Sequence, residues 1–234
     1  MSWRSVALVA LMSGPAAGLT AELVTLDSRA VVAWPAQILR ERPAVDASVV
    51  ATVDFGEQVA VLRSDEPGLP TTIGGLEGRW VEVHWEGARG WMFDAWLLPL
   101  PAPPADCGGL DAWTARWSPA GAVLTEWNED PATGQPFPQR IQGYTGGMRR
   151  VVSGGEGSPV AELWLPGVSA AQAWFVARRC HLVLAPVSRA AWPPRTAGGL
   201  TVSRVSGNLS IADAQGVVLL DLRPEPEGVW LAWR

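Results

Sequence analysis

Residues 79–98 read RWVEVHWEGARGWMFDAWLL. They end a longer stretch, residues 31–98, in which short runs of β-branched and aromatic residues are separated by Gly, Asp and Pro. The runs lie at residues 49–53, 59–62, 79–85 and 90–98. Such runs between turn residues are typical of a small all-β barrel or sandwich. Residues 65–78 are rich in Gly, Pro and Thr and predict one long loop inside it.

The alternation of side chains within residues 79–85 assigns them to two faces of a strand. Val81, Val83 and Trp85 share one face, and Trp80, Glu82 and His84 share the other. The first face is the more apolar, so we expect it to pack into the core. Trp80 is then left on the outer face beside Glu82.

Five short motifs follow one another along this stretch. They are Leu39-Arg40-Glu41-Arg42-Pro43, Gly56 ahead of Val59-Ala60-Val61-Leu62, Trp80 with Val83, Gly90-Trp91-Met92, and Asp94-Ala95-Trp96-Leu97. In this order they resemble the motifs of bacterial Src-homology-3-like (SH3b) domains. The resemblance implies a small β-barrel over residues 22–98 and a role in binding peptides or cell-wall material.

The same resemblance points to the residues that contact a ligand. In eukaryotic relatives of this fold, the first aromatic residue of the corresponding strand lines a peptide groove, together with aromatic residues that follow the glycine. Trp80, Phe93 and Trp96 occupy those positions here. They are the predicted binding residues. The alternative is that Phe93 and Trp96 close the end of the barrel or pack on a second domain.

Residues 1–21 have the pattern of a secretory signal. Arg4 precedes an apolar run at residues 6–12, and small residues follow. The run is too short to span a bilayer, and no later run is long enough for a membrane helix. We therefore expect export to the periplasm or the medium. The alternative is a frayed apolar N-terminus of a cytoplasmic protein.

A Pro-rich linker at residues 99–106 marks the domain boundary, and we expect it to be extended and semi-rigid. Residues 107–234 predict an α+β domain, mainly an antiparallel sheet with one helix at residues 170–181, where Ser169 is the N-cap. No family resemblance is found for it. The predicted strands lie at residues 122–127, 139–144, 148–153, 160–166, 182–184, 200–205, 209–212, 217–222 and 229–233.

The chain has two cysteines, Cys107 and Cys180. Disulfides persist in oxidising compartments, so an exported chain is expected to join them. In the chain-entropy model, closing a loop of this size contributes roughly 4 kcal/mol.

The alternative for Cys107 is catalysis. Residues 106–110, Asp-Cys-Gly-Gly-Leu, resemble the Asp-Cys-Ser-Gly motif of NlpC-type cell-wall cysteine peptidases, and His181 would stand for the family's histidine. A Cys–His pair makes a thiolate nucleophile. However, Gly108 replaces the family's serine, the linker replaces its Gly-rich aromatic run, and Cys180 competes for Cys107.

The residues give little support for nucleic-acid binding, metal binding or acid–base catalysis. A net charge of −5 gives no attraction to nucleic acid. Two His and two Cys, scattered along the chain, lack the spacing of a zinc site, so no metal and no cofactor is expected. The acidic cluster Glu126, Glu129 and Asp130 is interpreted as a solvated turn.

The sequence therefore predicts an exported, non-catalytic protein of the bacterial envelope. Its SH3-like domain would bind peptidoglycan or a peptide or protein partner. A purely structural domain without a ligand is the remaining alternative.

Overall fold

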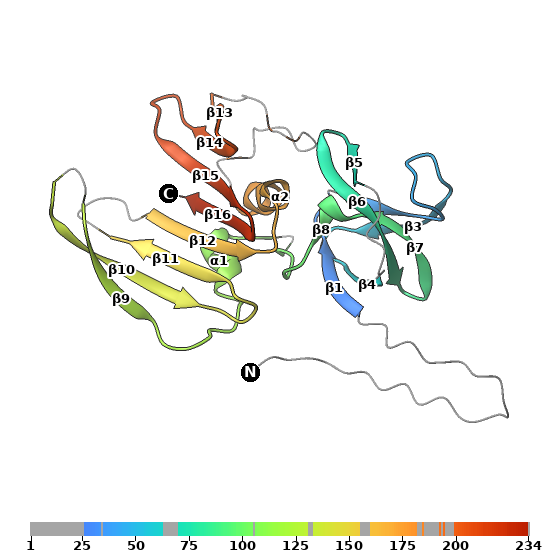
Figure 1. Ribbon diagram of the computed structural model, residues 1–234, viewed down its shortest axis with the longest axis horizontal. Coiled ribbons are helices and arrows are strands. Elements are labelled where there is room, and N and C mark those ends of the chain that lie inside the picture. The colour runs from blue at the N-terminus through green and yellow to red at the C-terminus, as the bar shows by residue number, and fades with distance from the viewer. Residues whose placement is uncertain are drawn as a thin grey trace.

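The computed structural model of the chain describes residues 26–33, 35–62, 70–104, 106–130, 133–154, 160–181, 184, 192, 194 and 199–233. Two antiparallel sheets of eight strands each make up most of it (Figure 1). The predicted mainly β fold class is confirmed. The predicted signal at residues 1–21 lies outside the described residues.

The first sheet runs in the order β3-β2-β7-β6-β4-β1-β8, with β5 paired to β6. Its core consists of buried aliphatic side chains from seven of the strands, including Leu39, Val83 and Met92. The first sheet comprises β1 Leu26–Val31, β2 Ala36–Arg40, β3 Val49–Asp54, β4 Gln58–Leu62, β5 Pro70–Ile73, β6 Leu76–Trp85, β7 Ala88–Phe93 and β8 Leu97–Leu98, with the 3-10 helix η1 Asp94–Trp96 before β8.

The faces of β6 agree with the prediction. Val83 is fully buried in the core, and Val81 and Trp85 pack against it. Glu86 and Gly87 form the turn to β7, both with positive φ, at 46° and 84°. This conformation is the two-residue turn that matches the twist of a hairpin.

The predicted loop at residues 65–78 is wrong in its second half. Residues 70–73 form β5, which pairs with the start of β6 from Pro70↔Arg79 to Ile73↔Leu76. The turn between them is Gly74-Gly75, and both glycines have positive φ. The two glycines therefore close a tight hairpin between Ile73 and Leu76, where the prediction took them as chain breakers.

The second sheet runs in the order β13-β14-β15-β16-β12-β11-β10-β9. Its strands agree with the predicted runs to within a few residues, except for the run at residues 182–184, of which only Leu184 is described. The second sheet comprises β9 Leu124–Glu129, β10 Pro136–Gly143, β11 Arg149–Ser153, β12 Val160–Pro166, β13 Thr201–Val205, β14 Asn208–Ala212, β15 Val218–Glu225 and β16 Gly228–Trp233.

Helix α2, Ala170–Cys180, lies between the two sheets (Figure 1). Its N-terminus is a capping box: Gln172 N donates to Ser169 Oγ at 3.2 Å, and Ser169 N donates to Gln172 Oε1 at 2.8 Å. The predicted N-cap at Ser169 is therefore confirmed. One side of the helix packs on β15 and β16, and the other meets η1 of the first sheet.

A second helix corrects the prediction of one helix. Helix α1, Leu110–Thr114, has only five residues, so no periodicity marks it in the sequence. Leu110 and Trp113 are buried in the same core as Trp174 of α2. The short helix forms because this core accepts both side chains.

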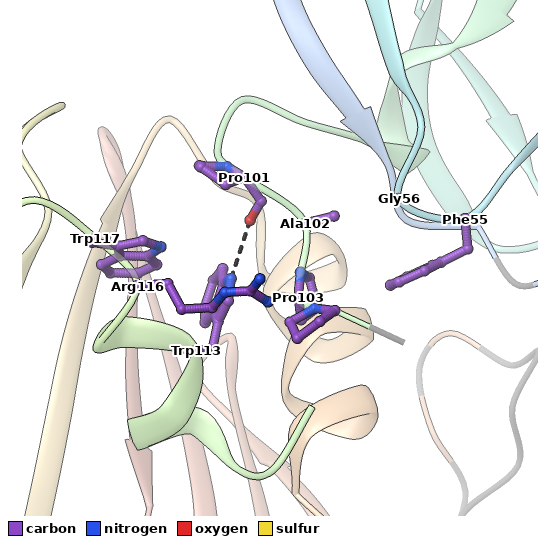
Figure 2. Close-up of a pocket in the computed structure, with 9 residues that line it drawn as sticks. Phe55, Gly56, Pro101, Ala102, Pro103, Trp113, Arg116 and Trp117 are labelled. Carbon is purple, nitrogen blue, oxygen red and sulfur yellow. Dashed lines mark hydrogen bonds between the residues drawn. The ribbon is translucent and has the colours of Figure 1, made fainter. Parts of the chain in front are cut away.

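The linker packs against the second part of the chain along most of its described length. Leu100 is buried in the large core beneath α2. The indole nitrogen of Trp113 donates to the carbonyl oxygen of Pro101 at 3.1 Å (Figure 2). The linker therefore has fixed tertiary contacts, which its composition alone does not reveal.

Candidate functional site

The three predicted binding residues line one pocket of about 410 Å³. Trp80 comes from β6, Phe93 ends β7, and Trp96 ends η1. We call this the aromatic pocket. Its remaining lining residues are Ala33, Ala36, Gln37, Ile38, Arg40, Val45, Ile73 and Phe175.

The backbone of β6, β7 and η1 holds the three rings together. Trp80 and Phe93 are cross-strand partners, with ring centroids 6.1 Å apart. Phe93 meets Trp96 edge to face, at 5.3 Å. Arg79 N donates to Asp94 Oδ1 at 2.6 Å, which ties the strand to η1. Edge-to-face aromatic pairs are favourable, so the rings stabilise one another without a ligand.

The three rings have different exposure. Phe93 is 1% exposed and packs with Ala171 of α2, whereas Trp80 and Trp96 are half-buried. Phe93 is therefore a buried floor, as the packing alternative expected. Trp80 and Trp96 are walls that a ligand can reach.

A fourth ring, Phe175, comes from α2 and was not predicted. It also packs against the cluster that contains Phe93. Its place depends on how α2 docks on the first sheet, and no local pattern in the sequence encodes that docking. The pocket is therefore built from both halves of the chain.

Two polar side chains complete the aromatic pocket. Gln37 is 4% exposed, and its Nε2 donates to the Phe93 carbonyl oxygen at 2.9 Å. Its Oε1 has no hydrogen-bond partner within the described residues. Arg40 Nη1 donates to the Ala47 carbonyl oxygen at 2.7 Å. The pocket thus combines apolar walls, one unused acceptor and one cation.

This set of groups suits binding more than bond breaking. None of the lining residues is a nucleophile, a histidine or a carboxylate. Within the described residues no cluster of three or more potential metal ligands exists. Apolar pockets with a few placed polar groups are typical ligand sites.

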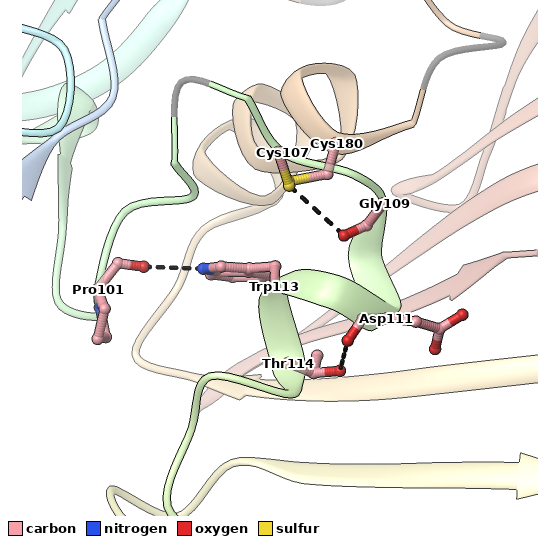
Figure 3. The surroundings of a disulfide bond; sticks show 7 residues. All are labelled: Pro101, Cys107, Gly109, Asp111, Trp113, Thr114 and Cys180. Carbon is pink, nitrogen blue, oxygen red and sulfur yellow. Dashed lines mark hydrogen bonds between the residues drawn. A yellow bond between two sulfur atoms is a disulfide. The ribbon is translucent and has the colours of Figure 1, made fainter.

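Cys107 and Cys180 form the predicted disulfide, with Cα atoms 5.0 Å apart (Figure 3). The bond joins the chain ahead of α1 to the last residue of α2. Sγ of Cys107 lies 3.4 Å from the Gly109 carbonyl oxygen. This contact is not a hydrogen bond, because a disulfide sulfur has no hydrogen to donate. The thiolate that the peptidase alternative requires does not exist while this bond stands.

Two other groups considered in the sequence lie on the surface. Glu126 and Glu129 sit on the exposed strand β9, so the acidic cluster is mainly strand, and only Asp130 begins a turn. Asp130 Oδ1 accepts from Thr133 N at 3.1 Å. His84 is exposed on β6. No described helix has the length and apolar character needed to cross a membrane.

Comparison with protein families agrees with the geometry of the first sheet. Residues 36–98 match the family described as bacterial SH3 domain. This match covers β2 to β8 and includes Trp80, Phe93 and Trp96. No curated protein and no solved structure matches the chain. Residues 36–98 are therefore a bacterial SH3 domain.

Proposed function

We propose that the protein is an exported, non-catalytic protein of the bacterial envelope whose SH3 domain binds peptides through the aromatic pocket. The peptide is part of the cell wall or of a partner protein. The observation that carries the proposal is the convergence of Trp80, Phe93 and Trp96 on one pocket of about 410 Å³.

The pocket fits an extended peptide with an apolar anchor. Half-buried tryptophans present a large apolar area at low entropic cost, which is why they dominate binding energy at many interfaces. Gln37 Oε1 is an acceptor without a partner among the described residues, and a peptide N–H is a donor that would satisfy it. Bacterial SH3 domains commonly bind peptidoglycan or proteins, which agrees with this chemistry.

Two features support the expected export. The pattern of residues 1–21 is that of a secretory signal. The disulfide between Cys107 and Cys180 belongs to an oxidising compartment. Both features favour the periplasm or the medium as the site of action.

Cosedimentation with purified peptidoglycan tests the proposal. Truncating a central aromatic anchor typically costs about 2 kcal/mol, so Trp80→Ala should weaken retention by about 10–100-fold. The matched control is Trp127→Ala, because Trp127 is 69% exposed and lies on β9 of the second sheet. The control variant should sediment like the wild type.

A second arm identifies the part of the cell wall that is bound. Peptidoglycan from which an amidase has removed the stem peptides should no longer retain the wild-type protein. Equal retention of wild type and Trp80→Ala, or no retention of either on intact peptidoglycan, would reject the aromatic pocket as a cell-wall site.

A further inference from the structure

A second pocket lies where the linker crosses between the two sheets. It has a volume of about 430 Å³ and is lined by Phe55 and Gly56, residues 101–104, and Trp113, Arg116 and Trp117. We call it the linker pocket. It shares no lining residue with the aromatic pocket.

The walls of the linker pocket are apolar and firmly held. Trp113 and Trp117 pack edge to face, with centroids 4.6 Å apart, and Trp117 packs in the same way on Tyr144 at 5.5 Å. On the other side, the guanidinium of Arg179 lies 5.6 Å from the centre of the Phe55 ring. Figure 2 shows the ring of Phe55 on one side of the pocket and that of Trp117 on the other.

Among the described residues, two donors that line this pocket have no acceptor, namely the indole N–H of Trp117 and the guanidinium of Arg116. Trp117 is 7% exposed, and its Nε1–H has no hydrogen-bond partner within the described residues. The neighbouring indole, Trp113, differs because its Nε1 already donates to Pro101. A buried N–H without a partner costs about 1–3 kcal/mol, and a ligand oxygen that accepts from it would remove this cost.

Arg116 supplies the second donor and the charge. It is exposed, and the described part of the chain gives its guanidinium neither an ion pair nor a hydrogen bond. None of the lining residues is acidic. The nearby carboxylate of Asp111 on α1 is already paired, 2.5 Å from Arg150 Nη2. Within the described residues, the pocket therefore carries one positive charge without an ion pair and one indole N–H without an acceptor.

We propose that the linker pocket binds a carboxylate carried by an apolar body. The guanidinium of Arg116 and the indole N–H of Trp117 hold the two carboxylate oxygens, since charge-assisted hydrogen bonds to a carboxylate are the strong ones. The apolar body packs on Phe55 and on the prolines of the linker. A phosphate group carries about 1.5–2 negative charges, which a single guanidinium neutralises only in part.

Such a carboxylate has two sources, the C-terminus of a peptide and a small free acid. Isothermal titration calorimetry on the full chain separates them with three probes. These are an N-acetylated dipeptide that ends in a free phenylalanine carboxylate, the same dipeptide as its C-terminal amide, and benzoate. The free dipeptide should bind at least about tenfold more tightly than its amide, since a charge-assisted pair contributes more than a neutral one.

The comparison with benzoate assigns the source. Binding of the dipeptide about tenfold tighter than benzoate indicates a peptide terminus, and equal binding indicates a small acid. Equal binding of the free dipeptide and its amide, or no binding of any free acid, would overturn the proposal.

Variants at the donors connect the binding to the pocket. Arg116→Gln should lower the affinity for the free dipeptide about tenfold or more, and Trp117→Phe, which keeps a ring but removes the N–H, about fivefold. Arg204→Gln is the matched control, because Arg204 is exposed on β13 of the second sheet. Arg116 is exposed, so its variant should fold normally, and wild-type affinity of Arg116→Gln would refute the proposed site.

Discussion

The side chain of Gln172 connects α2 to the SH3 domain. It is 6% exposed, and its Nε2 donates to the carbonyl oxygens of Asp94 at 3.1 Å and Leu97 at 2.8 Å. Its Oε1 accepts from Ser169 N in the capping box. The oxygen of this amide therefore caps the helix N-terminus, and its nitrogen donates to the SH3 domain.

Gln172→Glu separates these two roles. The new carboxyl group keeps the shape of the side chain and the oxygen that accepts from Ser169 N, but it removes both donors. Each lost hydrogen bond costs about 1 kcal/mol, and leaving two buried carbonyl groups beside an anion adds to this, so we expect a loss of about 3 kcal/mol at pH 7. For a chain of this size the melting temperature should fall by about 10 °C.

The penalty should depend on pH with a definite sign. Burial and two facing carbonyl oxygens favour the neutral form, so the pKa of the new carboxyl in the folded protein lies above its ordinary value of about 4.3. The unfolded chain loses the proton at lower pH than the folded one. The part of the penalty that comes from the charge is therefore complete above the folded pKa, shrinks as the pH falls and disappears below the unfolded value. The neutral carboxyl has one O–H, so the loss of the second hydrogen bond, about 1 kcal/mol, remains at low pH.

The assay is thermal unfolding, monitored by circular dichroism, of the wild type and the variant between pH 4 and 8. Gln135→Glu is the control, because Gln135 is exposed and precedes β10. The control should melt within about 2 °C of the wild type at each pH. The link between α2 and the SH3 domain through Gln172 is refuted if Gln172→Glu has the melting temperature of the wild type at pH 7. It is also refuted if the difference in melting temperature does not become smaller toward pH 4.

Three further predictions follow from the packing. Gly90→Ala should destabilise the protein by about 1–3 kcal/mol in urea unfolding, because its Cβ would lie 2.6 Å from the Arg40 carbonyl oxygen, whereas Gly154→Ala, with nothing within 4 Å, should be neutral. Native protein should show no titratable thiol, and one reactive thiol would revive the peptidase alternative. Replacing both cysteines by alanine should lower the free energy of unfolding by about 4 kcal/mol, since they are 73 residues apart. Phe175→Ala should weaken peptidoglycan retention about fivefold because α2 supplies that wall; unchanged retention would leave α2 outside the site.

The local pattern predicted the strands well, because each run of β-branched or aromatic residues could be read without knowledge of its neighbours. The faces of β6 followed from alternation alone. The short helix α1 and the hairpin of β5 were missed for opposite reasons. α1 is too short to show a period and depends on the core it enters, whereas the β5 turn was visible in Gly74-Gly75 and was misinterpreted.

The candidate sites show the same division between local and tertiary information. The resemblance placed Trp80, Phe93 and Trp96, and the structure brings all three to one pocket. Phe175 and the linker pocket lie beyond such a prediction, because they exist only where α2 and the linker dock. Within the described residues the indole N–H of Trp117 lacks an acceptor whereas that of Trp113 has one, a difference that no sequence pattern reveals.

Titration of ¹⁵N-labelled protein with muropeptides tests the central claim most directly. Each tryptophan gives one indole N–H signal, and Trp80→Phe, Trp96→Phe and Trp127→Phe identify three of the signals by their loss. We predict that the signals of Trp80 and Trp96 shift in a saturable way while that of Trp127 stays in place. Peptide binding in the aromatic pocket would be contradicted if the signals of Trp80 and Trp96 did not shift, or if the signal of Trp127 shifted by as much as theirs.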